Sequence, residues 1–284
     1  MKIIDPHLHF FALNEGDYHW LKADNPPFWP DKQELYHAFM PADLQLPEPL
    51  ELSGFVHIEA GFDNQRPWRE IAWLEKNISG RFRSIAFANL LGNDFKQVVR
   101  SLHQYPSFAG VRHILDEDAS DILASATAQQ HLNWLSEEEL IFEAQLFALD
   151  IEGINALVRT LDKLPKLNVV LNHAGFVPNR LAEHSRWLNA METLSEFPQV
   201  SVKCSGWEMT QRQWDKAWAR DSIHQVIDVF GTESVMLASN FPVSQLGMSY
   251  AQLWQFYALE LRFPKGLQEK YLNQNAARIY GFDK

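Results

Sequence analysis

Short apolar runs recur eight times along this chain, and segments long enough to form helices separate most of them. The runs are rich in β-branched or aromatic residues and end at turn-forming residues, a pattern typical of buried strands. The first run is Lys2-Ile3-Ile4, which leads into Asp5-Pro6-His7-Leu8-His9. The other seven predicted strands cover residues 54–60, 82–90, 108–115, 140–147, 168–174, 200–205 and 234–239.

Four of the intervening segments have the apolar spacing of amphipathic helices. These predicted helices cover residues 69–76, 93–103, 150–164 and 220–230, and a final helix is predicted over residues 268–280. Strands that alternate with helices form parallel βαβ units, and eight such units close into a barrel of about 250 residues. We therefore predict an α/β fold, a (β/α)8 TIM barrel that forms one domain over residues 1–284. An open doubly wound sheet is the alternative, but no glycine-rich phosphate loop follows the first strand.

A long irregular segment, residues 10–50, follows the first predicted strand. Loops of this length inside a compact domain are usually functional lids or disordered linkers. The segment carries many aromatic residues and prolines, including Trp20, Pro27 and Trp29, and its aromatic content argues against disorder. It is predicted either to cover a binding site as a lid or to plug one end of the barrel.

Charge and composition narrow the class of partner. The formal net charge of −11 argues against nucleic acid and against an anionic membrane surface, but it is compatible with a small-molecule substrate. The single cysteine, Cys204, excludes an intrachain disulfide and fits a reducing compartment. No apolar run approaches the ~20 residues of a membrane span, and no secretory leader is visible. We therefore expect a cytoplasmic protein, and the sequence leaves a monomer and a homodimer open.

Polar side chains stand near the carboxyl ends of all eight predicted strands, where TIM barrels carry their catalytic residues. His7 and His9 are two residues apart, so both imidazoles are expected on one side of the first strand. His173 precedes a glycine that permits a sharp turn, and we expect it in the site. Arg112 is suited to bind a carboxylate in bidentate fashion. It alternates with His113, however, so only one of them can face the interior, and a salt bridge to a helix is the other interpretation of Arg112.

Further candidates have alternatives that the sequence leaves open. Lys203 would bind a substrate carboxylate or carbonyl oxygen if it lies inside the rim, and would be a solvated cation if it lies outside. His57 with Glu59, and Glu143 with Gln145, are pairs on one face of a strand. They could orient a ligand or bond to each other.

Five short motifs occur in order along the chain. They are His7-Leu8-His9, Gly110-Val111-Arg112-His113, Asn172-His173-Ala174-Gly175, Val202-Lys203-Cys204-Ser205-Gly206 and Ala238-Ser239-Asn240-Phe241-Pro242-Val243. Together they resemble the amidohydrolase superfamily, and more narrowly its amidohydrolase-2 branch, from residue 3 to about residue 282. That branch holds sugar-acid lactonases and 2-pyrone-4,6-dicarboxylate lactonase. The resemblance therefore implies a (β/α)8 barrel that hydrolyses small cyclic esters.

The resemblance also implies roles for single residues. By position, His7 and His9 would be the first-strand pair and His173 the sixth-strand histidine. In that family the eighth strand normally ends in an aspartate that takes a proton from the attacking water, but here the position is Asn240. An amide cannot accept a proton near neutral pH. We therefore predict that Asn240 orients the water while His173 or His9 acts as the base.

The predicted reaction is thus hydrolysis of a sugar-acid lactone or a related carboxylated lactone, with His9, His173 and Asn240 as catalytic residues. The predicted substrate contacts are Arg112, Lys203, His57 and Glu143. At most one weakly held divalent ion, zinc or manganese, is predicted on His7 and His9, and metal-free catalysis stays open. One alternative is a decarboxylase of the same branch, against which Asn240 argues because that group relies on an acidic residue there. The other is a non-catalytic protein that binds a sugar acid.

Overall fold

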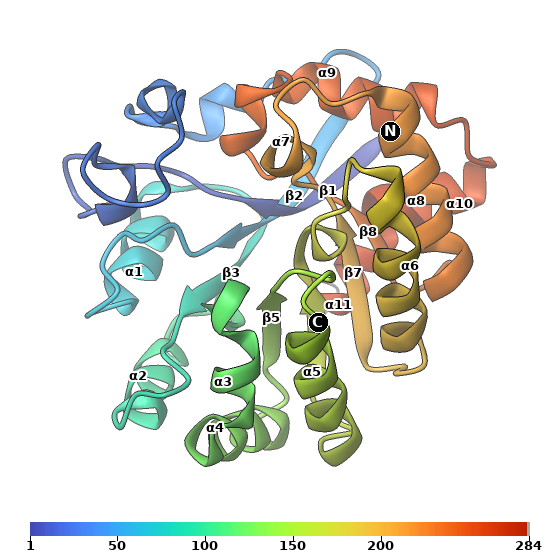
Figure 1. The fold of residues 1–284 in the computed structure, drawn as a ribbon. Coiled ribbons are helices and arrows are strands. Elements are labelled where there is room, and N and C mark those ends of the chain that lie inside the picture. The colour runs from blue at the N-terminus through green and yellow to red at the C-terminus, as the bar shows by residue number, and fades with distance from the viewer. Residues whose placement is uncertain (283–284) are drawn as a thin grey trace.

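Eight parallel strands follow one another in one sheet, in sequence order from β1 to β8. Their bounds are β1 Lys2–Leu8, β2 Glu51–Ile58, β3 Phe82–Phe87, β4 Phe108–Ile114, β5 Ile141–Gln145, β6 Asn168–Leu171, β7 Val200–Cys204 and β8 Val235–Leu237. This computed structural model describes residues 1–282, so the last two residues of the predicted domain lie outside the described part. Leu8 pairs in parallel with Phe241, and the amide of His9 donates to the carbonyl of Phe241 at 2.7 Å. These contacts bring the two edges of the sheet together, and the predicted (β/α)8 barrel is confirmed (Figure 1).

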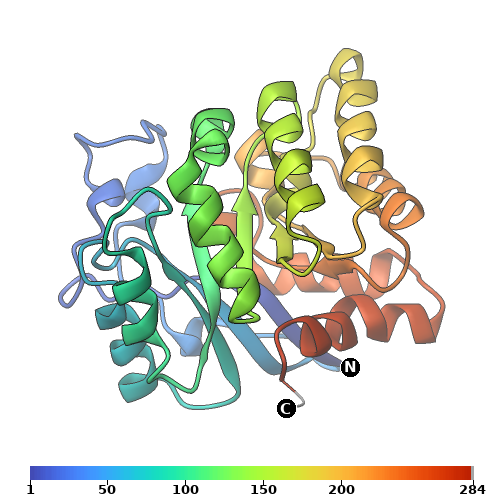
Figure 2. The ribbon, with the colours of Figure 1, turned by 90° about the horizontal axis from the view of Figure 1, so that it is seen from below.

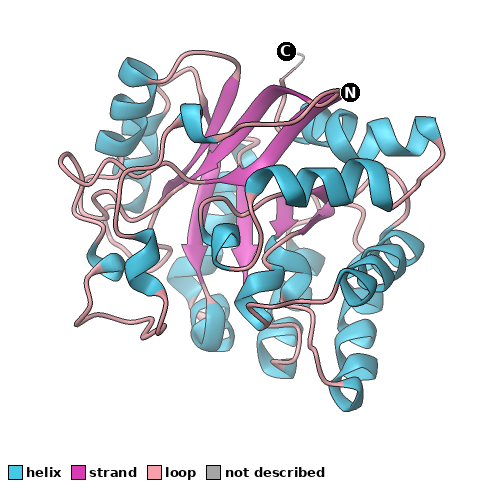
Figure 3. Cartoon of the chain, turned by 90° about the horizontal axis from the view of Figure 1, so that it is seen from above, coloured by secondary structure: helices cyan, strands magenta, loops and turns pink. Residues whose placement is uncertain are grey.

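Helices follow the strands and lie outside the sheet, as the views from below and above show (Figures 2 and 3). Their bounds are α1 Trp68–Asn77, α2 Phe95–Leu102, α3 Ala119–Ala124, α4 Ala126–Glu137, α5 Ile151–Lys163, α6 Leu181–Ser195, α7 Trp207–Thr210, α8 Lys216–Phe230, α9 Tyr250–Gln255, α10 Lys265–Glu269 and α11 Asn275–Ile279. The four predicted internal helices correspond to α1, α2, α5 and α8. The predicted final helix is one helical segment in which the π-helical turn Lys270–Gln274 joins α10 to α11. None of the helices in the described part is long and apolar enough to cross a membrane.

The interior of the barrel is filled in layers, which the alternation along β5 illustrates. Ile141 belongs to an apolar cluster of residues from six strands, and this cluster packs against Ala276 and Tyr280 at the C-terminal helix α11. Two residues further along, Glu143 is fully buried in a polar layer. Two residues beyond that, Gln145 reaches a cavity. The helix therefore closes one end of the barrel, and the functional groups lie toward the other.

The segment between β1 and β2 is ordered and lies beside the carboxyl ends of the strands (Figure 1). Its central contact is the buried ammonium of Lys32, which donates to the carbonyls of Trp20, Lys22 and Asn25 at 3.1, 2.7 and 2.6 Å. The indole of Trp20 in turn donates to the carbonyl of Ala60, just beyond β2, at 2.8 Å. The segment is thus anchored at the carboxyl-end rim of the barrel, where a lid over a binding site was expected to lie.

Candidate active site

A cavity of about 660 Å³ opens at the carboxyl ends of the strands, where TIM barrels carry out their chemistry. Each strand contributes to its wall near its carboxyl end or just beyond it, with His9, Glu59, Phe87, Arg112, Gln145, His173, Met209 and Asn240 belonging to β1 to β8 in turn. The long segment adds Trp20, Pro26, Pro27 and Trp29. A second hollow of about 830 Å³ lies at the amino ends, but it contains none of the predicted site residues. The first cavity is therefore the candidate active site.

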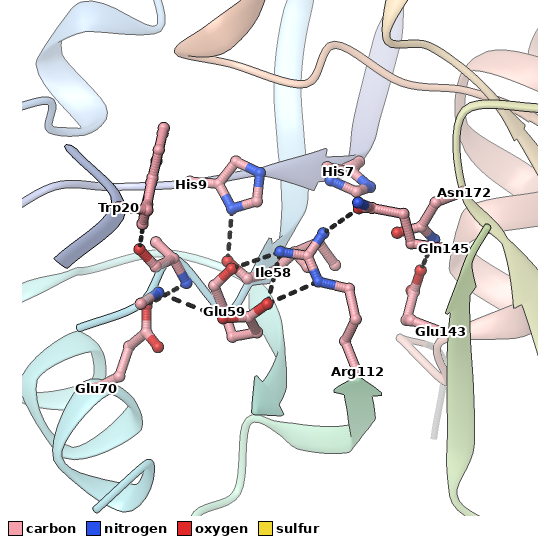
Figure 4. Close-up of polar contacts among 12 residues, drawn as sticks. His7, His9, Trp20, Ile58, Glu59, Glu70, Arg112, Glu143, Gln145 and Asn172 are labelled. Atoms are coloured by element: carbon pink, nitrogen blue, oxygen red, sulfur yellow. Dashed lines mark hydrogen bonds and ion pairs between the residues drawn. The ribbon is translucent and has the colours of Figure 1, made fainter. Parts of the chain in front are cut away.

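His9 presents a neutral imidazole to this cavity. Its Nδ1 lies 2.8 Å from the carbonyl oxygen of Ile58, as Figure 4 shows. A carbonyl can only accept a hydrogen bond, so we assign the ring proton to Nδ1, which leaves Nε2 as a proton acceptor. Burial and the charge of Arg112 hold the pKa of His9 well below its usual value of 6.5. The ring therefore stays unprotonated at neutral pH, as a general base requires.

Three histidine rings form a cluster at the end of β1. The centroid of the His7 ring lies 5.1 Å from that of His9 and 4.7 Å from that of His173. His173 lines the cavity, and its Nδ1 lies 2.9 Å from Oγ of Ser205. Burial and the charges of Arg112 and Lys203 lower the pKa of His173 well below 6.5. His7 is fully buried, and its Nε2 has no hydrogen-bond partner in the described part of the chain.

Left-handed backbone conformations follow β6 and β8, two of the strands that end earlier than predicted. The structure ends β6 at Leu171 and β8 at Leu237, whereas strands through residues 174 and 239 were predicted. His173 has a φ of 54° and Asn240 a φ of 62°, in the left-handed region that few non-glycine residues occupy. This conformation turns the chain out of the sheet at the two positions whose side chains line the cavity. Strain of this kind is typical of functional sites.

Arg112 points into the cavity, but its charge is already paired. Its Nε donates to Glu59 at 2.8 Å, and its Nη2 lies 2.7 Å from the same carboxylate (Figure 4). Nη1 donates to Gln145 at 3.2 Å. The predicted alternative of a bridge to a helix is wrong, because Glu59 follows β2. Glu59 is also not bonded to His57, whose ring lies near Glu70 with 3.8 Å between Nε2 and Oε1.

Lys203 and Glu143 form an ion pair in the layer below the cavity. Both side chains are fully buried, and Nζ lies 2.8 and 2.7 Å from the two carboxylate oxygens. Asn172 and the hydroxyl of Tyr280 also donate to this carboxylate. Burial lowers the pKa of Lys203 to about 8, although the Glu143 charge acts in the opposite direction. Removing one partner of a buried ion pair is strongly destabilising, so Lys203 and Glu143 contribute to the stability of the folded barrel.

The structure therefore separates the predicted site residues into two groups. His9, Arg112, His173 and Asn240 line the cavity. Lys203, Glu143 and His57 are at most 1% exposed and lie behind its wall, so their predicted contact with substrate stays a prediction.

The prediction missed Glu208, a buried residue of α7. The amide nitrogen of Asn240 donates to its Oε1 at 2.5 Å. Burial raises the pKa of Glu208 to about 7, although the hydrogen bond from Asn240 acts in the opposite direction. The sequence feature that could have identified Glu208 is its position, four residues after Cys204, the last residue of β7.

The residues at the predicted metal site do not fit a resident ion. No group of three or more His, Cys, Asp or Glu side chains in residues 1–282 lies close enough to hold one. His7 and His9 offer two ring nitrogens, whereas catalytic zinc uses three protein ligands. Nζ of Lys203 also lies 3.3 Å from Nδ1 of His7, and a neighbouring cation disfavours a divalent ion. The predicted ion on His7 and His9 stays a prediction, and no step below passes through it.

Known proteins resemble this chain along almost its whole length. A family model described as amidohydrolase matches residues 4–282. An L-fucono-1,5-lactonase of Burkholderia ambifaria is 25% identical, and the match covers 98% of this chain and 92% of that protein. An amidohydrolase structure from Burkholderia multivorans with bound zinc has a TM-score of 0.82 and 19% identity, with 99% of each chain covered. A putative 2-pyrone-4,6-dicarboxylic acid hydrolase from Pseudomonas putida has a TM-score of 0.74 and 21% identity, with 99% and 98% covered.

Proposed function

Because the chain belongs to the amidohydrolase family, we propose that it hydrolyses the ester bond of a small, uncharged lactone held in the cavity at the strand ends. The observation that carries this proposal is the imidazole of His9. Its Nδ1 is bonded to the backbone, its pKa is lowered by burial, and it lines a cavity of about 660 Å³, a size that suits a small molecule. The unprotonated Nε2 of this ring can accept a proton from a water molecule.

The reaction begins when Nε2 of His9 takes a proton from a water molecule while the water oxygen bonds to the lactone carbonyl carbon. The side chain of Asn240, which lines the same cavity, orients that water. If the Ser205 hydroxyl donates to Nδ1 of His173, the ring proton of His173 is on Nε2 and can stabilise the oxyanion. The carbonyl then re-forms, the ring C–O bond breaks, and the leaving oxygen takes the proton from His9. The product is an open-chain hydroxy acid.

The charges around the cavity favour an uncharged ring over a carboxylated one. Three acidic residues, Glu59, Asp116 and Glu117, line the cavity together with one arginine. That arginine, Arg112, is already paired with Glu59. A lactone with carboxylate groups would need cations that this lining does not supply. An uncharged sugar-acid lactone meets no such difficulty, and the lactonase name of the Burkholderia ambifaria relative supports this class.

A pH-indicator assay tests the proposal. Lactone hydrolysis at neutral pH releases a proton, so the purified protein is tested against uncharged aldonolactones and against 2-pyrone-4,6-dicarboxylate, with and without a chelator. We expect turnover of at least one aldonolactone, at a kcat/KM about 10-fold or more above that for the dicarboxylate. His9→Ala is the matched variant, and it should lose about 100-fold or more in kcat.

Three other results would contradict the proposal in whole or in part. Stabilisation of the folded protein by a lactone or sugar acid, without product from any lactone, would favour a binding protein. Proton uptake with release of carbon dioxide from an aromatic carboxylate would favour a decarboxylase. Faster hydrolysis of the dicarboxylate than of every aldonolactone would leave a lactonase but overturn the uncharged substrate class.

A further inference from the structure

One buried carboxyl group at the edge of the cavity has no part in the reaction described so far. Glu208 lies in α7 and is 1% exposed. Gly206, which begins this helix with a φ of 71°, approaches His173 so closely that an added Cβ would lie 2.6 Å from its Nδ1. A side chain at position 206 would therefore collide with the histidine. The fold thus places α7, and Glu208 with it, directly against the site.

The carboxylate of Glu208 has no cationic partner. No ion pair in the described part of the chain includes it. The nearby Arg212 pairs instead with Asp31, with 2.6 Å between Nε and Oδ2, and its Nη1 donates to the backbone carbonyl of Glu208. The side-chain contact that remains is the 2.5 Å hydrogen bond from Asn240. Burying a carboxylate without a cation is costly, and a perturbed carboxyl group beside a cleft is a candidate for a functional residue.

This hydrogen bond determines which end of the Asn240 amide is available to the cavity. Nδ2 donates to Glu208, so Oδ1 is the end left to face the cavity that Asn240 lines. We propose that Glu208 is a positioning residue that holds the Asn240 amide in this orientation, so that Oδ1 accepts a hydrogen bond from the attacking water. The proposal rests on the hydrolase function above. It explains how the Asn240 amide can bind the water where an aspartate would otherwise do so. The negative charge is that of the Glu208 carboxylate, which contacts the amide on the side away from the water.

The orientation depends on the ionisation of Glu208. An ionised carboxylate accepts from Nδ2, whereas a protonated one can donate to Oδ1 and turn the amide around. The groups that act on this carboxyl are Asn240, its own backbone amide and the charge of Arg212, and Tyr257 also faces it. Burial raises the pKa of Glu208 to about 7, so the change falls near neutral pH.

The test compares Glu208→Leu, which removes the acceptor, with Glu208→Gln, which keeps one in Oε1. We expect Glu208→Leu to lower kcat about 10- to 100-fold with KM within about 3-fold of wild type, because the water is misoriented rather than the substrate released. Glu208→Gln should stay within about 5-fold in kcat but lose the acid limb of kcat/KM near pH 7. Glu75→Leu is the control, because Glu75 is half-buried and accepts a backbone hydrogen bond from Ser107 away from the cavity.

A second measurement does not depend on turnover. Asn240→Asp places a carboxylate against Glu208, so its melting temperature should fall by about 3 to 8 °C between pH 5.5 and 8.5 relative to wild type. Adding Glu208→Gln to that variant should remove this pH-dependent loss. A wild-type protein that hydrolyses no lactone would contradict the proposed function. The melting temperatures would still test the contact between Asn240 and Glu208. Full kcat in a folded Glu208→Leu variant, a Gln variant as slow as the Leu variant, or a flat melting series for Asn240→Asp would each overturn the positioning role.

Discussion

Single residues determine which groups in the cavity can exchange protons. His9 and His173 line it as neutral rings, because burial and nearby cations lower the pKa of each well below 6.5. The positive charge of Arg112 disfavours protonation of the two rings. Because Glu59 pairs with Arg112, that charge is not available to bind a substrate carboxylate. The same burial that makes these side chains costly to charge therefore keeps them available as acceptors and donors near pH 7.

Replacing His173 tests its part in the reaction. In the proposed mechanism, its ring supplies a proton donor to the oxyanion, so His173→Ala should lower kcat about 100-fold while KM changes much less. Steady-state kinetics on the best lactone measure both quantities. The control is His184→Ala, since His184 lies on α6 and bonds to Gln225 outside the cavity. Full turnover by a folded His173→Ala protein would remove the assignment.

At the scale of secondary structure elements, the sequence predicted the strands better than the helices. All eight strands were predicted, because each is an apolar run buried inside the fold. Helices α3, α4, α6, α7 and α9 were not predicted. The buried face of α4 includes His131, which interrupts its apolar stripe. Helix α6 buries Trp187, Ala190, Met191 and Leu194 at helical spacing, so its signal was present in the sequence and was missed. The predicted end of the sixth strand was wrong because His173 adopts left-handed backbone angles, which a short-range pattern does not reveal.

The long segment between β1 and β2 depends on one buried ammonium. Lys32→Met would leave the three carbonyls that Nζ now binds without that donor, and it would loosen the wall that carries Trp20 and Trp29. We expect KM to rise about 10-fold with a smaller change in kcat, because the wall binds the substrate but does not react. Limited proteolysis within residues 22–32 should also become faster. Lys22→Met, an exposed lysine of the same segment, is the control; equal proteolysis rates in the two variants would contradict this role.

At the scale of the whole molecule, the side-chain pairs of the site could not be predicted, because the fold brings together residues that are far apart in the sequence. Arg112 is 53 residues from Glu59, Lys203 is 60 from Glu143, and Asn240 is 32 from Glu208. Strand-end position indicated which residues belong to the rim, and four of them line the cavity. Which side chain pairs with which depends on the register and tilt of strands distant in sequence. The sequence alone therefore could not reveal that Lys203 and Glu143 pair with each other in the buried layer, and their contact with substrate stays a prediction.

Barrel closure also depends on a buried aspartate. Oδ1 of Asp5, in β1, accepts from the amide of His7 at 3.2 Å and from that of Ser239, just past β8, at 3.1 Å. Burial raises the pKa of Asp5 from 3.8 to about 6, although these hydrogen bonds act in the opposite direction. The folded state thus holds this proton more tightly than the unfolded state. The stability that the proton contributes is fully present below pH 4 and is lost as the pH rises through about 6.

Asp5→Asn separates the titration from the hydrogen bonds, because the amide keeps Oδ1 as the acceptor for both backbone groups. The free energy of unfolding of this variant minus that of wild type should be near zero below pH 4. It should then rise to about 3 kcal/mol above pH 6, since the variant buries no charge. Denaturant unfolding at a series of pH values measures the difference, and Asp121→Asn, at an exposed position on α3, is the control. A difference that does not change between pH 4 and 7 would mean that Asp5 does not bind its proton in the folded barrel, and that its charge is compatible with the closed seam.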